Sequence, residues 1–141
     1  MRKLSPGQGM PMVTLHQQPG RYAVCRLSPA DAVPDWVGGQ GLVSITRTDD
    51  ELSIVCPEAR VPADCRAERD WRCLSVEGPL PFDAIGVLAS LATPLAKRGI
   101  SIFVISTHDT DHLLVKDDQL REAINTLIAA GHAVQTPADD E

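Results

Sequence analysis

The second half of the chain alternates between two kinds of apolar pattern, and this alternation constrains the fold more than any other feature. Apolar residues recur at helical spacing from Ile85 to Ala96 and again from Leu120 to Ile128. Short apolar runs typical of strands flank these stretches at 71–77, 100–106, 112–116 and 132–135. The order strand, helix, strand, strand, helix, strand predicts a ferredoxin-like α+β domain. Both helices would cover one face of a four-stranded antiparallel sheet.

Single residues in this half predict where the helices end and where one helix is kinked. Gly99 and Gly131 stand where glycines commonly end helices. Pro94 lies inside the first helical stretch and removes one backbone hydrogen bond, so a kink in the helix axis is expected. The run 100–106 is almost wholly apolar, which is typical of a strand at the centre of a sheet.

The first half of the chain carries strand patterns and one weaker helix signal. Four strands are predicted, at 13–17, 21–27, 42–48 and 51–56. A Pro-Gly pair separates the first two and Asp49-Asp50 separates the last two, so two hairpins are expected. Ser28-Pro29-Ala30-Asp31 predicts the start of a short helix. Residues 57–69 are polar and contain proline, which predicts a connector.

Composition limits the partners and the location. The 141 residues carry a formal charge of −6 with scattered basic residues, which argues against a nucleic-acid partner. No apolar run approaches the ~20 residues of a membrane span. Residues 1–7 have no apolar core behind them and do not resemble a signal peptide, so a cytoplasmic location is expected.

The four cysteines lack the C-x-x-C spacing of a zinc or redox motif, so reduced thiols are expected. Cys25, Cys56 and Cys73 stand in apolar runs, where cysteine usually acts as a small core residue. Neither a structural metal nor a cofactor is predicted.

The loop from Leu80 to Val87 leads from a strand into the first helix and is one candidate binding site. The first turn of a helix has N–H groups without helical partners and carries the positive end of the helix dipole. It can therefore hold a carboxylate or a phosphate. Gly86 would let the backbone approach a ligand closely. The same composition is also typical of a loop that only turns and caps, and the pattern alone favours that alternative.

Seven consecutive polar residues, 106–112, form a second candidate. Asp109 and Asp111 could bind an ammonium group. The hydroxyl groups that would assist them belong to Ser106, Thr107 and Thr110. A metal site that adds His108 and His112 is disfavoured, because alternate residues of a strand point to opposite sides. The remaining alternative is an exposed, solvated turn.

Catalysis finds little support in the sequence. No nucleophile elbow, phosphate loop, zinc-protease motif or dinucleotide fingerprint is present, so an enzyme is not predicted. His16 and His132 are expected to be surface or half-buried residues rather than a general base.

Several stretches of the chain resemble the ACT domain. The matching segments of the second half are 82–89, 94–96 and 99–115, including a Ser-Thr-x-Asp-Thr-Asp run. The matching segments of the first half are 35–36, 47–56 and 61–62. More narrowly, the chain is similar to small bacterial ACT proteins related to the CASTOR-type arginine sensors. The resemblance covers about residues 13–135.

The resemblance implies a ferredoxin-like C-terminal ACT domain at 67–136 and a shorter ACT-like N-terminal module at 13–66 that shares its sheet. A mobile tail at 1–12 and an acidic tail at 137–141 are expected at the two ends.

The resemblance further implies a non-catalytic regulatory or sensor protein that binds an amino acid or similar small ligand at a module or subunit interface. A homodimer or higher homo-oligomer is expected. The implied ligand-binding residues are Asp83, Ile85, Gly86, Val87, Ser106, Thr107, Asp109, Thr110 and Asp111. Ile85-Gly86 replaces the Thr-Gly of many relatives, which leaves the ligand's identity open. The alternative function is a structural or partner-binding ACT module with a vestigial pocket.

Overall fold

The computed structural model describes residues 11–82 and 84–137. The predicted tails at 1–12 and 137–141 therefore lie mostly outside the described residues. Of the first predicted tail, Pro11 is buried and Met12 is exposed. The chain forms two compact units. The N-terminal unit is Gly20–Arg72, and the C-terminal unit combines the chain up to Pro19 with the chain from Cys73 onward.

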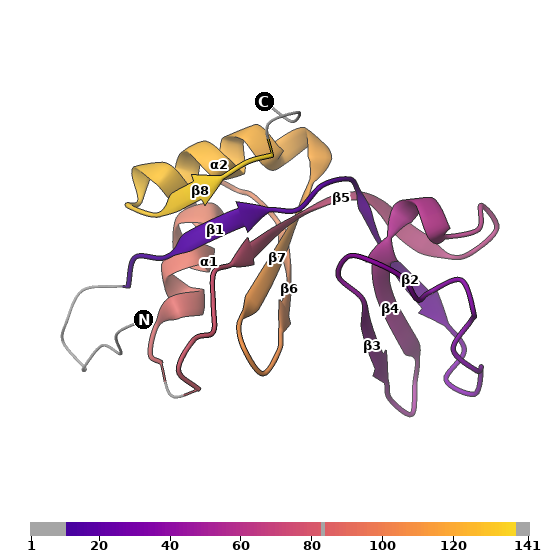
Figure 1. Cartoon of the computed structure of the whole chain (residues 1–141). Coiled ribbons are helices and arrows are strands. Elements are labelled where there is room, and N and C mark those ends of the chain that lie inside the picture. The colour runs from indigo at the N-terminus through magenta and orange to yellow at the C-terminus, as the bar shows by residue number, and fades with distance from the viewer. Residues whose placement is uncertain (1–10, 83, 138–141) are drawn as a thin grey trace. The chain divides into compact units, whose positions relative to one another are not determined.

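Apart from a helix predicted to begin at Ser28, the secondary structure follows the predicted order along the chain (Figure 1). The strands are β1 (Thr14–Gln17), β2 (Tyr22–Leu27), β3 (Ser44–Arg47), β4 (Leu52–Pro57), β5 (Ala67–Val76), β6 (Ile102–Ser106), β7 (Asp111–Lys116) and β8 (Ala133–Gln135). The helices are α1 (Val87–Lys97) and α2 (Leu120–Ala129), with 3-10 turns η1 (Glu58–Arg60) and η2 (Asp117–Gln119).

The sheet of the C-terminal unit has the strand order β6-β7-β5-β1-β8. This is the ferredoxin-like order with one strand added, because β1 lies between β5 and β8. Strand β1 is antiparallel to β5, with Leu15 opposite Val76, and parallel to β8, with Thr14 opposite Ala133. The prediction of four strands was therefore wrong by one, since it placed β1 in a hairpin with β2.

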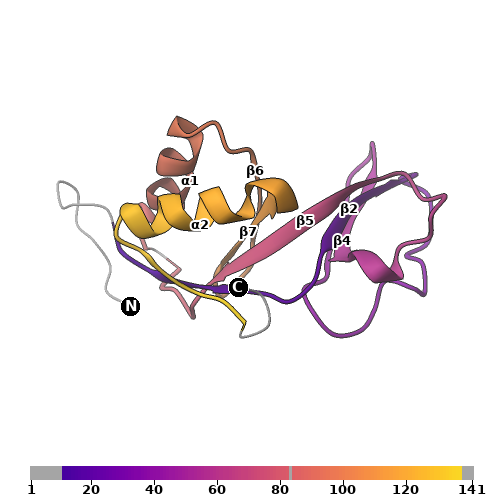
Figure 2. The ribbon, with the colours of Figure 1, turned by 90° about the horizontal axis from the view of Figure 1, so that it is seen from above.

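Both helices cover one face of this sheet, as Figure 2 shows for β1, β5 and β7. A single core fills the space between helices and strands. Its buried members are Val13, Leu15, Leu74, Val76, Val87, Leu91, Leu95, Ile100, Leu113, Val115, Ala123 and Leu127. The apolar residues on one side of α1 and α2 pack against alternate residues of the strands. The helical and the strand periodicities seen in the sequence therefore contribute to one core.

Strand β6 lies at an edge of this sheet and not at its centre. Within the described residues it pairs only with β7, in the antiparallel register that sets Ile102 opposite Val115. Its apolar side chains, Ile102 to Ile105, are half-buried. The prediction of a central strand was wrong because an unbroken apolar run does not say how many neighbours a strand has.

Helix α1 begins directly after Gly86, which has a left-handed backbone with φ 80°. Glycine adopts this conformation without the strain that a Cβ atom would cause. The helix continues through Pro94 to Lys97, and Gly99, with φ 72°, follows its C-terminal cap as predicted. Gly131, with φ 104°, follows α2 in the same way.

The N-terminal unit has the strand order β3-β4-β2-β5. The predicted hairpin of β3 and β4 is confirmed, with Ile45 opposite Ile54. Its core is small, and its buried members are Ala23, Cys25, Val37, Leu52, Ile54, Cys56 and Val61. Strand β2 pairs with β4 and β5, so the predicted hairpin of β1 and β2 does not form.

Residues 28–31 form a turn and not the predicted helix. The hydrogen bonds typical of a helix start are present: the Ser28 amide donates to Asp31 Oδ2 at 3.2 Å, and the Asp31 amide donates to the Ser28 carbonyl at 3.0 Å. No helix follows them, because Pro34 and a pair of glycines interrupt the chain a few residues later.

Strand β5 contributes to both units. Its residues Ala67 and Glu68 pair with β2, whereas Leu74 to Val76 pair with β1. The predicted connector at 57–69 therefore contains η1 and the first residues of this ten-residue strand.

His132 is buried, with 4% of its surface exposed, and not the surface or half-buried residue that was expected. Its Nδ1 accepts a hydrogen bond from the Val13 amide at 3.1 Å. Its Nε2 lies 3.1 Å from the Ser90 carbonyl, to which it donates. The imidazole thus links the start of the chain to α1 as a structural residue.

Among the described residues, none of the helices combines the length and the apolar character needed to cross a membrane.

We expect Leu127→Ala to lower the free energy of unfolding by about 3 kcal/mol, because it leaves a cavity in the core of the C-terminal unit. The matched control is Ile128→Ala at the next position of α2, where half of the side chain is already exposed. Its cost should be below about 1 kcal/mol. Urea unfolding followed by circular dichroism measures both. Equal losses would contradict the assignment of the buried face.

Candidate functional site

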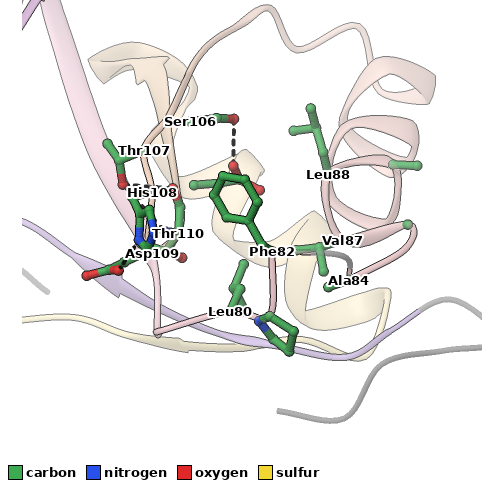
Figure 3. Close-up of a pocket in the computed structure, with 14 residues that line it drawn as sticks. Leu80, Phe82, Ala84, Val87, Leu88, Ser106, Thr107, His108, Asp109 and Thr110 are labelled. Atoms are coloured by element: carbon green, nitrogen blue, oxygen red, sulfur yellow. Dashed lines mark hydrogen bonds and ion pairs between the residues drawn. The ribbon is translucent and has the colours of Figure 1, made fainter.

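A pocket of about 660 Å³ opens between the start of α1 and the turn that joins β6 to β7 (Figure 3). Its walls come from three segments: the loop after β5, the first turn of α1, and the β6–β7 turn. The lining residues are Leu80, Pro81, Phe82, Ala84, Gly86, Val87, Leu88, Ala89, Ser106, Thr107, His108, Asp109, Thr110 and Asp111. A space of this size is in the range of small-molecule sites.

The first turn of α1 faces this pocket. No side chain of the described residues caps the helix, whose residues Val87, Leu88 and Ala89 line the space. The backbone N–H groups of a first turn have no partner within the helix and carry its positive partial charge. This wall of the pocket is therefore suited to an anionic group such as a carboxylate.

The opposite wall is polar because β6 and β7 end in hydroxyl and carboxylate side chains. Ser106 and Asp111 are register partners, and the Ser106 hydroxyl donates to Asp111 Oδ1 at 2.6 Å. An ionised carboxylate has about four acceptor positions, so this bond leaves acceptor capacity for a cationic ligand group.

The β6–β7 turn has a fixed internal geometry. The Thr107 amide donates to the Thr110 carbonyl at 2.8 Å, and the Thr107 hydroxyl donates to the same oxygen at 3.1 Å. The Thr110 amide in turn lies 3.4 Å from the Thr107 hydroxyl oxygen. The two threonines therefore shape the turn and do not extend freely into solvent.

Two hydrogen bonds attach this turn to the segment that leaves β5. The Thr110 hydroxyl donates to the Val76 carbonyl at 2.7 Å, and the Leu80 amide donates to the Asp109 carbonyl at 2.7 Å. Gly78 permits this approach, because a Cβ atom there would lie 3.1 Å from the Asp109 carbonyl oxygen. The two polar walls are thus held on either side of one space.

The charges of the pocket have one sign. Asp109 and Asp111 are acidic, and no lysine or arginine is among the lining residues. Among the described residues, the first turn of α1 supplies positive partial charge to the pocket. A ligand that carries a carboxylate and an ammonium group would match both walls.

Two aromatic rings, those of Phe82 and His108, lie at the rim of the pocket. Their ring centroids are 5.1 Å apart with the planes tilted by 38°, and 84% of the Phe82 surface is exposed. Figure 3 shows Phe82 between the polar turn and α1. His108 Nδ1 is also 3.0 Å from Asp109 Oδ1.

The structure brings most of the predicted site residues to this one pocket. Those that line it are Gly86, Val87, Ser106, Thr107, Asp109, Thr110 and Asp111. Ile85 is half-exposed and is not among the lining residues. Asp83 lies outside the described residues. The role of each as a ligand contact stays a prediction.

The sequence prediction did not include the apolar part of the lining. The missed residues are Leu80, Pro81, Phe82, Ala84, Leu88, Ala89 and His108. Leu80, Pro81, Phe82 and Ala84 lie inside the candidate loop 80–87 but were not among its predicted ligand contacts, although an aromatic residue beside a helix start was an available signal.

The described residues contain no group of three or more histidine, cysteine or acidic side chains arranged to hold a metal ion. His112 follows Asp111 in β7 and points to the sheet face without helices. Its Nδ1 is 2.8 Å from the Ser75 hydroxyl. Burial lowers the pKa of His112 from its usual 6.5, and the charge of Asp111 opposes this effect.

The fold and the pocket define a ferredoxin-like α+β protein with a small-molecule-sized site beside a helix start. Residues 66–129 match the ACT domain, and residues 20–64 match a second family described as an N-terminal domain. The chain belongs to the ACT domain family.

Known proteins with related sequences or folds support this assignment. A crystal structure of a protein from Agobacterium tumefaciens has 46% identity and a TM-score of 0.86, over 90% of this chain and 95% of that one. The human "cytosolic arginine sensor for mTORC1 subunit 1" is 43% identical over 58 residues, which is 40% of this chain. The match spans only 18% of that relative. Aspartate kinase of Clostridium acetobutylicum shares the fold alone, with 11% identity and a TM-score of 0.60 over 88% of this chain and 36% of that one.

The lowered pKa of His112 makes stability depend on pH. The unfolded chain binds a proton at His112 near pH 6.5, whereas the folded chain binds it only at lower pH. The contribution of His112 to the free energy of unfolding is therefore complete above pH 6.5. It is lost as the pH falls through the pKa that His112 has in the folded chain. Urea unfolding at pH 7.5 and 5.0 should show this loss.

His112→Asn is the control, because its amide oxygen can replace Nδ1 as the partner of Ser75. The other histidines are the same in both chains, including His16, whose Nε2 is 2.8 Å from Glu77, and His108 beside Asp109, so the difference between the chains reports His112. We expect a smaller loss of stability at pH 5.0 in the variant. Identical losses in the two chains would rule out His112 as a source.

Proposed function

We propose that this ACT protein is a non-catalytic regulatory or sensor protein that binds a free amino acid or a similar zwitterion in the α1 pocket. The observation that carries the proposal is the pairing of a helix start that no described side chain caps with Asp111 across one space. The ligand's carboxylate would accept hydrogen bonds from the first turn of α1. Its ammonium group would donate to Asp111, which Ser106 orients.

The electrostatics of the pocket favour a zwitterion over a simple acid. The helix start supplies roughly half an elementary charge, which is weaker than the two nearby carboxylates. An anion without an ammonium group would meet net repulsion. A ligand that also carries a cation gains a charge-assisted hydrogen bond, which is about twice as strong as a neutral one.

The relatives support an amino acid as the ligand class. One is named as an arginine sensor, and another is an aspartate kinase described as an important allosteric enzyme. The lining residues Asp109 and Asp111 are compatible with a basic side chain as well as with the ammonium group. Because the sensor named above is cytosolic, we also propose a cytoplasmic location.

We further propose two modules, 13–66 and 67–136. The support is that the two family matches meet between residues 64 and 66. The first strand is an exception to a simple division, since β1 joins the sheet of the C-terminal unit.

The pocket rim favours a second chain as its cover. Phe82, Ile85 and Leu88 are apolar and 84%, 50% and 39% exposed. A large exposed aromatic beside two aliphatic side chains is typical of an interaction surface. We propose that a second copy covers this rim and desolvates the bound ligand, which strengthens both charged contacts. A different protein partner on the same rim is the alternative function.

Thermal unfolding against the twenty amino acids at millimolar concentration tests the ligand class. A ligand at ~100 times its dissociation constant adds ~2.7 kcal/mol, so we expect one amino acid to raise the melting temperature by several degrees. Asp111→Asn should weaken that ligand by roughly 10- to 100-fold, because it removes the charged partner of the ammonium group. Isothermal titration measures the affinity.

Asp49→Asn is the matched control, since Asp49 is an exposed aspartate in the turn between β3 and β4. It should leave both the shift and the affinity unchanged. An absence of any shift across the panel would remove the sensor proposal and favour the partner-binding alternative.

The rim predicts how the chain associates. Phe82→Ser should weaken self-association measured by sedimentation velocity, because it removes the most exposed aromatic surface. Ile45→Ser, at a 47% exposed position of the N-terminal unit, should leave association unchanged. A monomer at all concentrations, with or without ligand, would contradict a second copy as the cover.

A further inference from the structure

Three of the four cysteines gather in the core of the N-terminal unit. Cys25 in β2 and Cys56 in β4 lie on the same face of the sheet, because Cys25 pairs with Ile54 and Ala23 pairs with Cys56. Cys65 packs against the same core from the turn just before β5, whose Ala67 pairs with Cys25. Cys65 precedes Ala67 by two residues and so lies on the same side as Ala67 and Cys25, which places Cys25 between Cys65 and Cys56.

The three thiols differ in exposure. Cys25 and Cys56 are fully buried, whereas Cys65 is half-exposed, and its Sγ lies 3.8 Å from the Arg66 carbonyl. Cys65 is therefore the thiol of this group that a dissolved reagent reaches first. Cys73, the fourth cysteine, is buried in the C-terminal unit and is not part of this group.

A fixed cation lies beside the group. The Arg60 guanidinium donates to the Val37 carbonyl at 3.2 Å and to the Gln40 carbonyl. Gly39 leaves room for it, since a Cβ atom at this position would be 2.6 Å from Nη2. The hydrogen bond from Cys25 lowers the pKa of the Cys56 thiol, burial opposes this, and the Arg60 charge lowers the pKa further. The same hydrogen bond and burial raise the pKa of Cys25.

We propose that Cys65, Cys25 and Cys56 form a peroxide-sensitive thiol site whose product is a disulfide between Cys65 and Cys25. Ordinary core packing explains the burial of Cys25 and Cys56. It does not explain why a half-exposed thiol contacts them or why a cation is held beside them. A solvent-accessible thiol next to a resolving cysteine is one feature of redox-sensitive sites, and Cys65 with Cys25 supplies it.

The disulfide would form in two steps. Hydrogen peroxide is the oxidant: the Cys65 sulfur attacks one peroxide oxygen, the O–O bond breaks, and a sulfenic acid and water result. The Cys25 sulfur then attacks the Cys65 sulfur, and the S–O bond breaks with loss of a second water. The proton that Cys25 releases ends on the departing hydroxide and completes this water, and Cys56, whose pKa is lowered by Cys25 and by the Arg60 charge, relays it. Two thiols are oxidised and one peroxide is reduced to two waters.

Treatment of the full chain with hydrogen peroxide tests the proposal. Thiol titration in denaturant should fall from four groups to two. Proteolysis without reductant, followed by mass spectrometry, should find a peptide pair joined through Cys25 and Cys65. Four persistent thiols, a Cys25–Cys56 bond, or a bond only between chains would each overturn the proposal.

Variants separate the roles of the residues. Cys65→Ser should keep its remaining thiols reduced, whereas the matched control Cys73→Ser should still form the disulfide. Cys25→Ala should stop the reaction at a Cys65 sulfenic acid, which dimedone labels.

Arg60→Gln should slow disulfide formation at pH 7 and shift its pH dependence upward, an effect that a purely structural arginine would not produce. Oxidation of Cys65→Ser at the rate of the parent chain would overturn the assignment of Cys65.

Discussion

The pairing of strand β5 with two sets of partners is the constraint on which the rest of the structure depends. Ala67 and Glu68 complete the sheet of the N-terminal unit, and Leu74 to Val76 lie between β1 and β7 in the other. Between them, Asp70 adopts φ 65°, a left-handed conformation that a non-glycine residue adopts at a cost. Its amide donates to Glu58 Oε1 at 2.7 Å, which offsets part of that cost. The two units thus share one strand.

The end of β5 also determines the pocket. The Val76 carbonyl accepts the Thr110 hydroxyl, and the chain then turns back so that the Leu80 amide reaches the Asp109 carbonyl. These bonds fix the acidic turn opposite the start of α1, which no side chain of the described residues caps. Neither wall is unusual alone, since helix starts and polar turns are common. Together they can bind a small molecule, because one space of suitable size lies between them. The helix start suits a carboxylate, and the acidic turn suits an ammonium group.

The sequence predicted the features that depend on neighbours along the chain and missed those that depend on distant ones. Helices α1 and α2 and the β3–β4 hairpin follow from local periodicity and turns. The insertion of β1 beside β8 and the edge position of β6 depend on pairing between distant segments, which an apolar run does not encode. The same holds for the site: Ser106 and Asp111 are close in sequence and were predicted, whereas the contact of Phe82 with His108 was not.

The two units differ in how much core each can build. The C-terminal unit buries twelve core residues under two helices, whereas the N-terminal unit, Gly20–Arg72, buries seven in its core, two of them cysteines. A unit of about fifty residues is near the size at which natural domains need added support. In the reduced chain that support is the continuation of β5 into the larger sheet. A disulfide between Cys25 and Cys65 would join β2 to the segment just before β5. Redox chemistry would therefore change the stability of this unit more than that of its neighbour.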